Sequence, residues 1–392
     1  MSWPMVKLGE IFTISRGGSP RPIQDYITDS CNGVNWIMIG DTEPNSKYIR
    51  HTAKKIKFEG VKKSRKVYPG DLLLTNSMSF GRPYILDVEG CIHDGWLVLS
   101  PKNNQIHIDY FYHYLNSPTA KIIISNKAAG AVVKNLNSDI VRNLEIPFPP
   151  FAEQVRIAST LDKADGIRQK REQAIKLADD FLRATFLEMF GDPVQNPKGW
   201  NVKPLADQII HANNGISRRR KEDTNEGDIV LRLQDVHYSG ITFDKELNRI
   251  KLVDKEKQIA RVEYDDLLFI RVNGNPNYVG RTAVFKSYIE PVYHNDHLIR
   301  IKLDNEYQSD FLCYLINSPF SRKLIAQQIK TSAGQHTISQ DGILKLMFYR
   351  PPIELQEKFI NIKNKIESIF YRKDKHEDLF ASISNKLIHS IK

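Results

Sequence analysis

The sequence has few cysteines and no long apolar run. Its three cysteines, Cys31, Cys91 and Cys313, are scattered and form no Cys-x-x-Cys pair. An odd, scattered set argues against a disulfide framework and a zinc site, and it fits a reducing cytosol. No apolar run approaches the length of a membrane span, and Pro4 and Lys7 stand where a signal peptide would need its apolar core. The sequence therefore predicts a cytoplasmic protein that has no membrane partner.

Signatures of catalysis are missing as well. The sequence contains no Gly-x-Gly-x-x-Gly, no phosphate-loop Gly-Lys-Ser/Thr and no His-Glu-x-x-His. The stretch nearest to the Asn/Asp-Pro-Pro-Tyr/Phe motif of adenine methyltransferases is residues 148–151, where Phe148 replaces the polar residue that must accept the amino hydrogen. We interpret this stretch as a helix cap. The absence of these motifs favours a binding protein over an enzyme.

Two groups of polar residues have the chemistry of metal ligands but not the surroundings. Carboxylates that lie near lysines can form a nuclease metal site but are more typical of a solvated surface, as at Asp244, Glu246, Asp254 and Glu256. Three histidines lack convincing partners and are interpreted as hydrogen-bonding residues: His93, His294 and His297. The sequence therefore predicts no metal site.

The composition is that of a folded, basic protein. A chain of 392 residues is too long for one hydrophobic core and predicts two domains. Lysine and arginine number 56 against 46 aspartate and glutamate, which gives a net charge of +10. This excess favours a polyanionic partner, although many basic proteins bind none.

Two stretches have the pattern of long helices. The first follows Pro149-Pro150 and runs to Phe190, before Gly191-Asp192-Pro193, and the second follows Pro351-Pro352 and runs nearly to Lys392. Apolar residues in both recur at the 4-3-4-3 spacing of a coiled-coil seam. The seam residues are Ile157, Leu161, Ala164, Ile175, Ala178, Leu182 and Met189, then Phe359, Ile362, Ile366, Ile369, Phe380, Ile383 and Leu387. Either stretch alone can be a surface helix with a core stripe, but two matched copies favour helices that pair with each other.

The two halves of the chain repeat one another. Trp200 to Leu205 matches Trp3 to Leu8, and Gly280-Arg281 matches Gly81-Arg82. The same holds for further anchors, such as Asn317-Ser318-Pro319 with Asn116-Ser117-Pro118, and Ala333-Gly334 with Ala129-Gly130. The anchors keep their order, whereas the loops between them differ. The chain is therefore predicted to be two copies of a domain-plus-helix unit, with binding residues in the loops.

This arrangement resembles the specificity (S) subunits of type I restriction–modification systems. The resemblance is carried by Pro149-Pro150-Phe151-Ala152-Glu153-Gln154-Val155-Arg156-Ile157, by Phe186-Leu187-Glu188-Met189-Phe190-Gly191-Asp192-Pro193, and by the strand entry at Gly70. It covers the whole chain in the order domain, helix, domain, helix. The second copy departs at Asp265, which replaces the glycine of the first strand entry, but it keeps the glutamine at Gln356.

The resemblance implies an α/β (mixed α+β) fold with two target recognition domains in a tandem pseudo-repeat. The implied parts are recognition domain 1 at residues 1–150, a spacer helix at 151–190, recognition domain 2 at 191–352 and a C-terminal spacer helix at 353–392. The two helices would pair as an antiparallel coiled coil that sets the distance between the domains.

The resemblance also implies a non-catalytic reader of double-stranded DNA. Each domain would read one half of a split, asymmetric site. The chain would dock two modification (methyltransferase) subunits and restriction (translocase/endonuclease) subunits. S-adenosylmethionine, ATP and Mg would bind to those partners, and no cofactor would bind to this chain.

Candidate DNA contacts fall in three pairs of equivalent loops. The first pair is basic: Arg16, Ser19 and Arg21 with Ser217, Arg218, Arg219 and Arg220. The second comprises Asn76, Ser77, Ser79 and Arg82 with Arg271, Asn273, Asn275, Asn277 and Arg281. The third comprises Lys127, Lys134 and Asn135 with Lys330, Gln335 and His336. Arginine can contact guanine or phosphate through two hydrogen bonds, and asparagine can read adenine through N6 and N7.

Each candidate loop also has a plainer interpretation. The basic loops can be solvated turns, and Asn-Gly-Asn-Pro-Asn at 273–277 is an excellent turn sequence. Because Gly81-Arg82 recurs as Gly280-Arg281, these arginines are predicted to hold phosphate or scaffold rather than to specify sequence.

Three other functions remain open from the sequence. A fused methyltransferase or nuclease is disfavoured by the missing motifs. A scaffold that binds no DNA would use its helices only to assemble partners. A specificity subunit of a related type II system would have the same sequence features and differ in its partner, a fused methyltransferase–nuclease.

Overall fold

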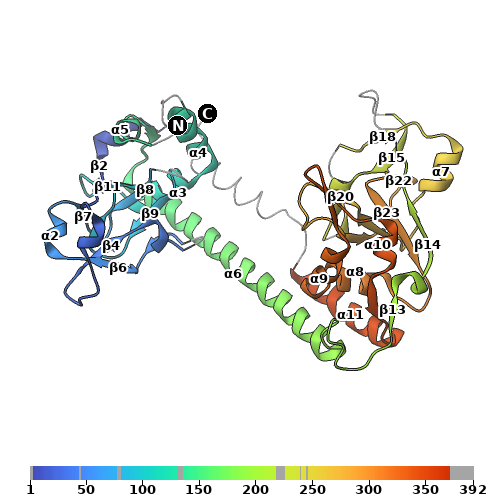
Figure 1. Ribbon diagram of the computed structural model, residues 1–392. Helices are drawn as coiled ribbons and strands as arrows, with labels where there is room; N and C mark the ends of the chain where they lie inside the picture. The colour runs from blue at the N-terminus through green and yellow to red at the C-terminus, as the bar shows by residue number, and fades with distance from the viewer. Residues whose placement is uncertain are drawn as a thin grey trace. The chain divides into compact units, whose positions relative to one another are not determined.

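The computed structural model describes residues 3–43, 46–76, 81–129, 136–217, 226–238, 240–243 and 246–370. By their contacts, these residues divide into unit 1, up to Glu172, and unit 2, from Gln173 onward. Figure 1 shows the helices and strands of each unit. None of the helices among these residues is both long and apolar enough to cross a membrane.

Unit 1 contains short strands and helices in a mixed order. Its strands are β1 (Met5–Lys7), β2 (Phe12–Arg16), β3 (Ile27–Thr28), β4 (Val34–Ile37), β5 (Tyr48–Ile49), β6 (Lys54–Ile56), β7 (Arg65–Val67), β8 (Leu72–Thr75), β9 (Pro83–Leu86), β10 (Gly90–Ile92), β11 (Trp96–Pro101) and β12 (Glu145–Pro147). Its helices are α1 (Leu8–Ile11), α2 (Phe58–Val61), α3 (Ile108–Asn116), α4 (Pro118–Ala129), α5 (Ser138–Arg142) and the first part of α6 (Phe151–Phe190).

The core of unit 1 lies on both faces of one five-stranded sheet, β2-β11-β8-β9-β5. In β8, Leu72 and Leu74 belong to the core cluster that includes Phe111 of α3, whereas Leu73 belongs to the cluster that includes Ile92 of β10. Side chains alternate between the faces of a strand, so a strand that is buried on both faces needs consecutive apolar residues. The second five-stranded sheet, β3-β6-β4-β10-β7, covers the face opposite the helices.

Unit 2 contains a matching set of elements. Its strands are β13 (Val202–Pro204), β14 (Ile209–Asn214), β15 (Asp228–Leu231), β16 (Val236–His237), β17 (Gly240–Ile241), β18 (Arg249–Ile250), β19 (Leu267–Ile270), β20 (Val272–Asn273), β21 (Thr282–Val284), β22 (Val292–His294), β23 (Leu298–Leu303), β24 (Lys330–Ser332), β25 (Gln335–Thr337) and β26 (Met347–Tyr349). Its helices are the last part of α6, α7 (Asp254–Ala260), α8 (Ser309–Asn317), α9 (Pro319–Gln328), α10 (Gln340–Leu344) and α11 (Ile353–Phe370).

The sheet topology confirms the duplication that the sequence predicts. The order β2-β11-β8-β9 in unit 1 corresponds to β14-β23-β19-β21 in unit 2. A parallel pair of strands also recurs in another sheet of each unit. It is β4 with β10 in unit 1 and β15 with β22 in unit 2. The entry strand pairs with the strand before the helix in both units, β1 with β12 and β13 with β26. The two halves are therefore one fold built twice.

Helix α6 begins and ends where the proline and glycine signals predict. It starts at Phe151, after Pro150, and it ends at Phe190, where Gly191 takes the left-handed φ of +78°. A proline also separates two shorter helices of unit 1. They are α3 and α4, with Pro118 as the first residue of the second.

A buried glutamine fixes the start of each long helix to its own unit. Gln154 is fully buried, accepts a hydrogen bond from His107 N at 2.9 Å, and donates to the carbonyl oxygens of Gln105 and Pro149. Gln356 makes the same three bonds in unit 2, to Gln308 N, Glu306 O and Pro351 O. The glutamine after the proline pair is thus a structural residue that ties helix, loop and domain together.

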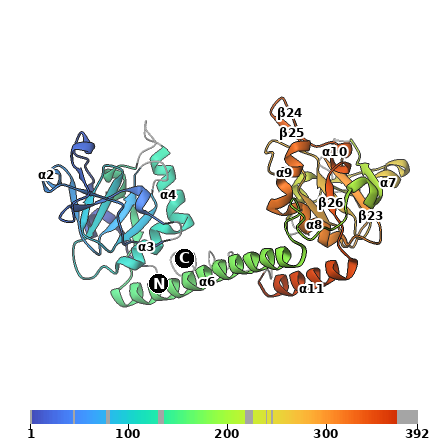
Figure 2. The same cartoon turned by 60° about the horizontal axis from the view of Figure 1, so that its bottom comes forward.

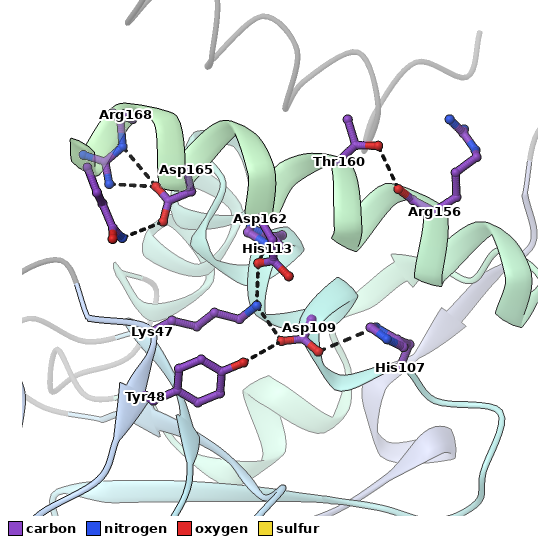
Figure 3. A network of polar contacts seen from close by, with 11 residues as sticks. Lys47, Tyr48, His107, Asp109, His113, Arg156, Thr160, Asp162, Asp165 and Arg168 are labelled. Atoms are coloured by element: carbon purple, nitrogen blue, oxygen red, sulfur yellow. Dashed lines mark hydrogen bonds and ion pairs between the residues drawn. The ribbon is translucent and has the colours of Figure 1, made fainter. Parts of the chain in front are cut away.

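A second polar contact fastens α6 to unit 1. Lys47 Nζ lies 2.5 Å from Asp109 of α3 and 2.6 Å from Asp162 of α6, and His113 Nε2 lies 2.7 Å from the same Asp162 oxygen (Figure 3). Burial alone would raise the pKa of Asp162, but hydrogen bonds from His113 and Lys47 lower that pKa to about 2. The carboxylate is therefore held ionised by two hydrogen-bond donors.

Part of the apolar pattern on the long helices serves the cores of the units. Ile157 and Leu161 are fully buried in the core cluster of unit 1, and Phe359 is fully buried in that of unit 2. At these positions the core-stripe interpretation holds, because the ends of the helices pack on their own domains. Ile369 is 67% exposed in the structure. Phe380, Ile383 and Leu387 lie outside the described residues, so the pairing of the two helices stays a prediction at those positions.

Candidate nucleic-acid interface

In unit 1, candidates from two separate loops meet at one turn. The turn is His93–Gly95, between β10 and β11. Arg16 Nε donates to the Asp94 carbonyl at 3.0 Å, and Ser19 Oγ donates to the Asp94 carboxylate at 2.9 Å. Arg21, which is 82% exposed, lies 3.5 Å from the same carboxylate. The first basic loop is therefore held against this turn by Asp94, a residue that the sequence did not single out.

Asn76 from the second loop also contacts this turn. Its Nδ2 donates to Asp94 O at 2.7 Å, and the residue is only 3% exposed. Burial alone would raise the pKa of Asp94, but the hydrogen bond from Ser19 and nearby positive charge lower it. Because the amide of Asn76 is used inside the domain, the exposed cations Arg16 and Arg21 are the more accessible candidates at this place.

Unit 2 repeats this arrangement with a different side chain. Arg271 stands where Asn76 stands, and its Nη1 donates to Asp296 O at 3.2 Å. The main chain confirms the equivalence, since Asn76 N bonds to Gly95 O and Arg271 N bonds to His297 O. Both units thus have this contact, although the side chain that makes it is the neutral Asn76 in unit 1 and the cationic Arg271 in unit 2.

An exposed three-stranded sheet gathers candidates from two loops of unit 2. The strands β20, β25 and β24 pair so that Asn273 lies opposite His336, and His336 lies opposite Thr331. Thr331 Oγ1 lies 2.8 Å from His336 Nδ1, and Gln335 is exposed. The hairpin of β24 and β25 projects beyond α9 in Figure 2. A two-stranded ribbon of this kind fits the DNA major groove.

The loop after β20 has the local structure of an asparagine-rich turn. Asn273 Oδ1 accepts from Asn275 N at 2.9 Å, and Asn275 Oδ1 accepts from Asn277 N at 3.0 Å. The turn interpretation of this loop is therefore confirmed. Within the described part of the chain, the side-chain NH₂ groups of Asn273 and Asn275 donate no hydrogen bond, so the same loop also presents donors to solvent.

Comparison with known proteins decides the family. A profile of the type I restriction modification DNA specificity domain matches residues 2–177. The type I restriction enzyme StySPI specificity subunit of Salmonella potsdam is 30% identical over 329 residues, which cover 79% of this chain and 70% of that protein. The chain belongs to the family of type I restriction–modification specificity subunits. The EcoKI specificity subunit of Escherichia coli is 24% identical over 79% of this chain and 70% of its own length.

Solved structures show the same fold. The S subunit of a type I restriction–modification system from M. genitalium aligns with a TM-score of 0.60 at 16% identity, covering 100% of this chain and 97% of that one. A chain from a structure of type I R-M complex assembly aligns with a TM-score of 0.53 at 15% identity, covering 99% and 98%. The mixed fold with tandem domains is therefore confirmed for this specificity subunit.

Several predicted DNA contacts of the specificity subunit lie outside the described residues. They are Ser77, Ser79, Lys134, Asn135, Arg218, Arg219 and Arg220. Ser217, the first residue of the second basic loop, is described and is exposed. The predictions for all these loops stay predictions.

Two of the places considered for catalysis have a structural role in this family member. The proline pair at residues 149–150 precedes α6, which confirms the helix-cap interpretation of this stretch. Glu256 Oε2 accepts from Val253 N at 3.0 Å in the first turn of α7, as a helix-capping carboxylate does. Members of the family are in general specificity subunits without catalytic activity.

Two of the three histidines, His93 and His294, form side-chain hydrogen bonds inside the fold. His294 is fully buried with Nδ1 2.8 Å from Ala260 O, and burial lowers its pKa to about 4. His93 Nδ1 accepts from Gly95 N at 2.8 Å, and burial lowers its pKa as well. The described residues hold no group of three or more His, Cys, Asp or Glu side chains arranged to bind a metal. The hydrogen-bonding interpretation of His93 and His294 is confirmed.

Proposed function

We propose that this specificity subunit reads a split, asymmetric site in double-stranded DNA, with one half read by each unit. The observation that carries the proposal is one scaffold built twice with unlike loop residues. Asn76 and Arg271 occupy equivalent positions and bond to equivalent turns, at Asp94 and Asp296. Equal scaffolds place their loops alike on DNA, whereas the unlike exposed residues of the loops around these contacts read unlike bases.

The basic character of the chain supports DNA as the partner. The net charge is +10, and Arg16 and Arg21 are exposed in the first basic loop. Phosphate neutralisation by such residues supplies most sequence-independent affinity for DNA.

The proposal extends to the partner subunits. The chain docks two modification (methyltransferase) subunits and the restriction subunits in the cytoplasm, and it catalyses no reaction itself. S-adenosylmethionine, ATP and Mg bind to the partners. Exposed apolar side chains on α6 support a docking role for this helix, with Ile167, Leu177 and Phe181 between 54% and 70% exposed.

The decisive experiment expresses this chain with the modification subunit encoded beside it and maps N6-methyladenine across the host genome by long-read sequencing. We expect a single motif with two unlike halves and a fixed gap. A continuous motif would contradict the assignment of one half to each unit. A stable complex that methylates nothing would contradict the recognition role.

A further inference from the structure

Each unit contains a Gly-Arg turn that packs against the helix after the Ser-Pro pair. Gly81 and Gly280 have φ of +81° and +78°. An added Cβ would meet Cγ2 of Ile124 in α4 at 3.1 Å, and Cγ2 of Ile325 in α9 at 2.6 Å. The arginine after each glycine is therefore brought to the surface of that helix in both units.

In unit 2 this arginine lies beside a second arginine. The Arg281 guanidinium lies 3.8 Å from the ring centroid of Tyr238 and 4.2 Å from that of Tyr278. Arg322 of α9 donates to two carbonyl oxygens of the loop 276–279, at 3.0 and 3.1 Å. Burial and the charge of Arg281 lower the pKa of Arg322. Two cations thus share one place on the surface of unit 2.

Unit 1 has a matching pair of cations. The Arg82 guanidinium lies 5.2 Å from the ring centroid of Tyr84. Lys121 stands three residues before Ile124, as Arg322 stands three residues before Ile325. Partial burial and the charge of Arg82 lower the pKa of Lys121. The two pairs are Arg82 with Lys121 and Arg281 with Arg322.

Neither pair is neutralised within the described part of the fold. Among the described residues, none of the four cations forms an ion pair with a carboxylate, and the buried Nε of Arg281 has no hydrogen-bond partner. By contrast, Lys47 and Lys286 each contact two aspartates. Adjacent like charges repel, so a fold that keeps them together twice leaves room for an anion that both can bind.

We propose that each matched pair, Arg82 with Lys121 and Arg281 with Arg322, holds a phosphate of the DNA backbone. The inference rests on the proposed DNA-reading function and assigns Lys121 and Arg322 a role in it. A phosphodiester offers two oxygens to two cationic donors, and such contacts are charge-assisted. Because the pairs lie on the scaffold that the units share, they position each unit on the duplex and carry no sequence information.

The test measures how salt affects DNA binding by the complex of this chain with its modification subunit. Fluorescence anisotropy gives Kd from low to high KCl on two labelled duplexes, one with the methylation motif of the complex and one with a scrambled sequence. Lys121→Gln and Arg322→Gln are each expected to lower the slope of log Kd against log salt, by up to about 0.9, the value for complete loss of one phosphate contact. The ratio of the two Kd values should stay unchanged, because the lost contact does not read bases.

Two control variants separate charge from loop support. Arg322→Lys keeps the charge, as Lys121 does in unit 1, and should retain the wild-type slope. Lys323→Gln removes an exposed charge from the next position of α9 and should also leave the slope unchanged. If Arg322 only supports the loop 276–279, both Arg322 variants will change the Kd ratio and neither will change the slope, which would overturn the inference.

The outcomes also separate this inference from the proposed function. A wild-type complex that discriminates between the duplexes, with slopes unchanged in Lys121→Gln and Arg322→Gln, would sink the phosphate sites alone. A wild-type complex that fails to discriminate would sink the recognition role. The slopes on the scrambled duplex would still decide the phosphate sites in that case.

Discussion

At the scale of single residues, two buried glutamines stand out because each satisfies three backbone groups. Gln154→Ala would leave His107 N and the carbonyl oxygens of Gln105 and Pro149 without a partner. We expect it to destabilise unit 1 by about 2–4 kcal/mol, measured by urea unfolding followed within that unit. Gln173→Ala, at an exposed position of the same helix, is the matched control.

The isosteric change Gln154→Glu tests hydrogen bonding separately from packing. It keeps the shape, but it turns a donor into a second acceptor that faces two carbonyl oxygens. We expect a loss similar to that of the alanine variant. A near-neutral result would mean that packing, and not the hydrogen bonds, holds Gln154 in place.

A second residue-scale prediction concerns the turn of the exposed hairpin. Ala333 has a φ of +47° and Gly334 a φ of +77°, which is the geometry of a two-residue hairpin turn that favours Asn-Gly. Ala333→Asn should therefore stabilise the hairpin by about 0.5–1 kcal/mol. Hydrogen exchange at the amides of β24 and β25 should slow about two- to fivefold. Faster exchange would contradict the left-handed conformation of Ala333.

At the scale of elements, close approach of a strand end to a turn requires glycine in both units. A Cβ on Gly17 would lie 2.0 Å from His93 O, and one on Gly215 would lie 2.1 Å from His294 O. We expect Gly17→Ala and Gly215→Ala each to cost about 1–3 kcal/mol by overpacking, with main-chain shifts in the nearby basic loop. Gly274→Ala, which meets nothing within 4 Å, is the control for both in thermal unfolding.

The attachment of α6 to unit 1 should depend on pH through Asp162. Its folded-state pKa of about 2 lies below the ordinary value of 3.8, so its stabilising effect is present above about pH 4 and is lost as the pH falls towards 2. Asp162→Asn should remove that part of the acid sensitivity. Because the carboxylate is 44% exposed, we expect a difference of only about 1 kcal/mol between the curves of wild type and variant. Parallel curves from pH 5 to pH 2 would contradict this assignment.

Much of the element order could be predicted from the sequence, whereas the site could be predicted only in part. The ends of α6 follow from local proline and glycine signals, and the strand 72–75 follows from a short apolar run. The contacts of Asp94 with Arg16 and Ser19 could not be predicted, because residues 75 to 78 positions apart meet only when the sheet forms. The equivalence of Lys121 and Arg322 could not be predicted either, because it depends on which residues of α4 and α9 pack against the Gly-Arg turns.

At the scale of the whole molecule, the two units should act on different halves of the DNA site. In the complex with the modification subunit, Gln335→Ala or His336→Ala should change or relax one half of the methylated motif, because both residues lie in unit 2. Arg16→Ala, in unit 1, should affect the other half. Genome-wide mapping of N6-methyladenine checks both outcomes, and a variant that alters both halves at once would contradict the division of labour.

The anchoring of α6 at both ends has a consequence for insertions in this helix. Its first turn is fixed to unit 1 through Gln154, and Phe186 and Phe190 are buried in the core of unit 2. Each added helical residue lengthens the helix by about 1.5 Å and turns its far end by about 100°. One extra residue would therefore rotate Phe186 and Phe190 by about 100° relative to the first turn of the helix and would move them about 1.5 Å further from it. Insertions of about 7, 11 or 18 residues return the far end of the helix to within about 20° of its original rotation, so variants with such insertions should work better than variants with one extra residue.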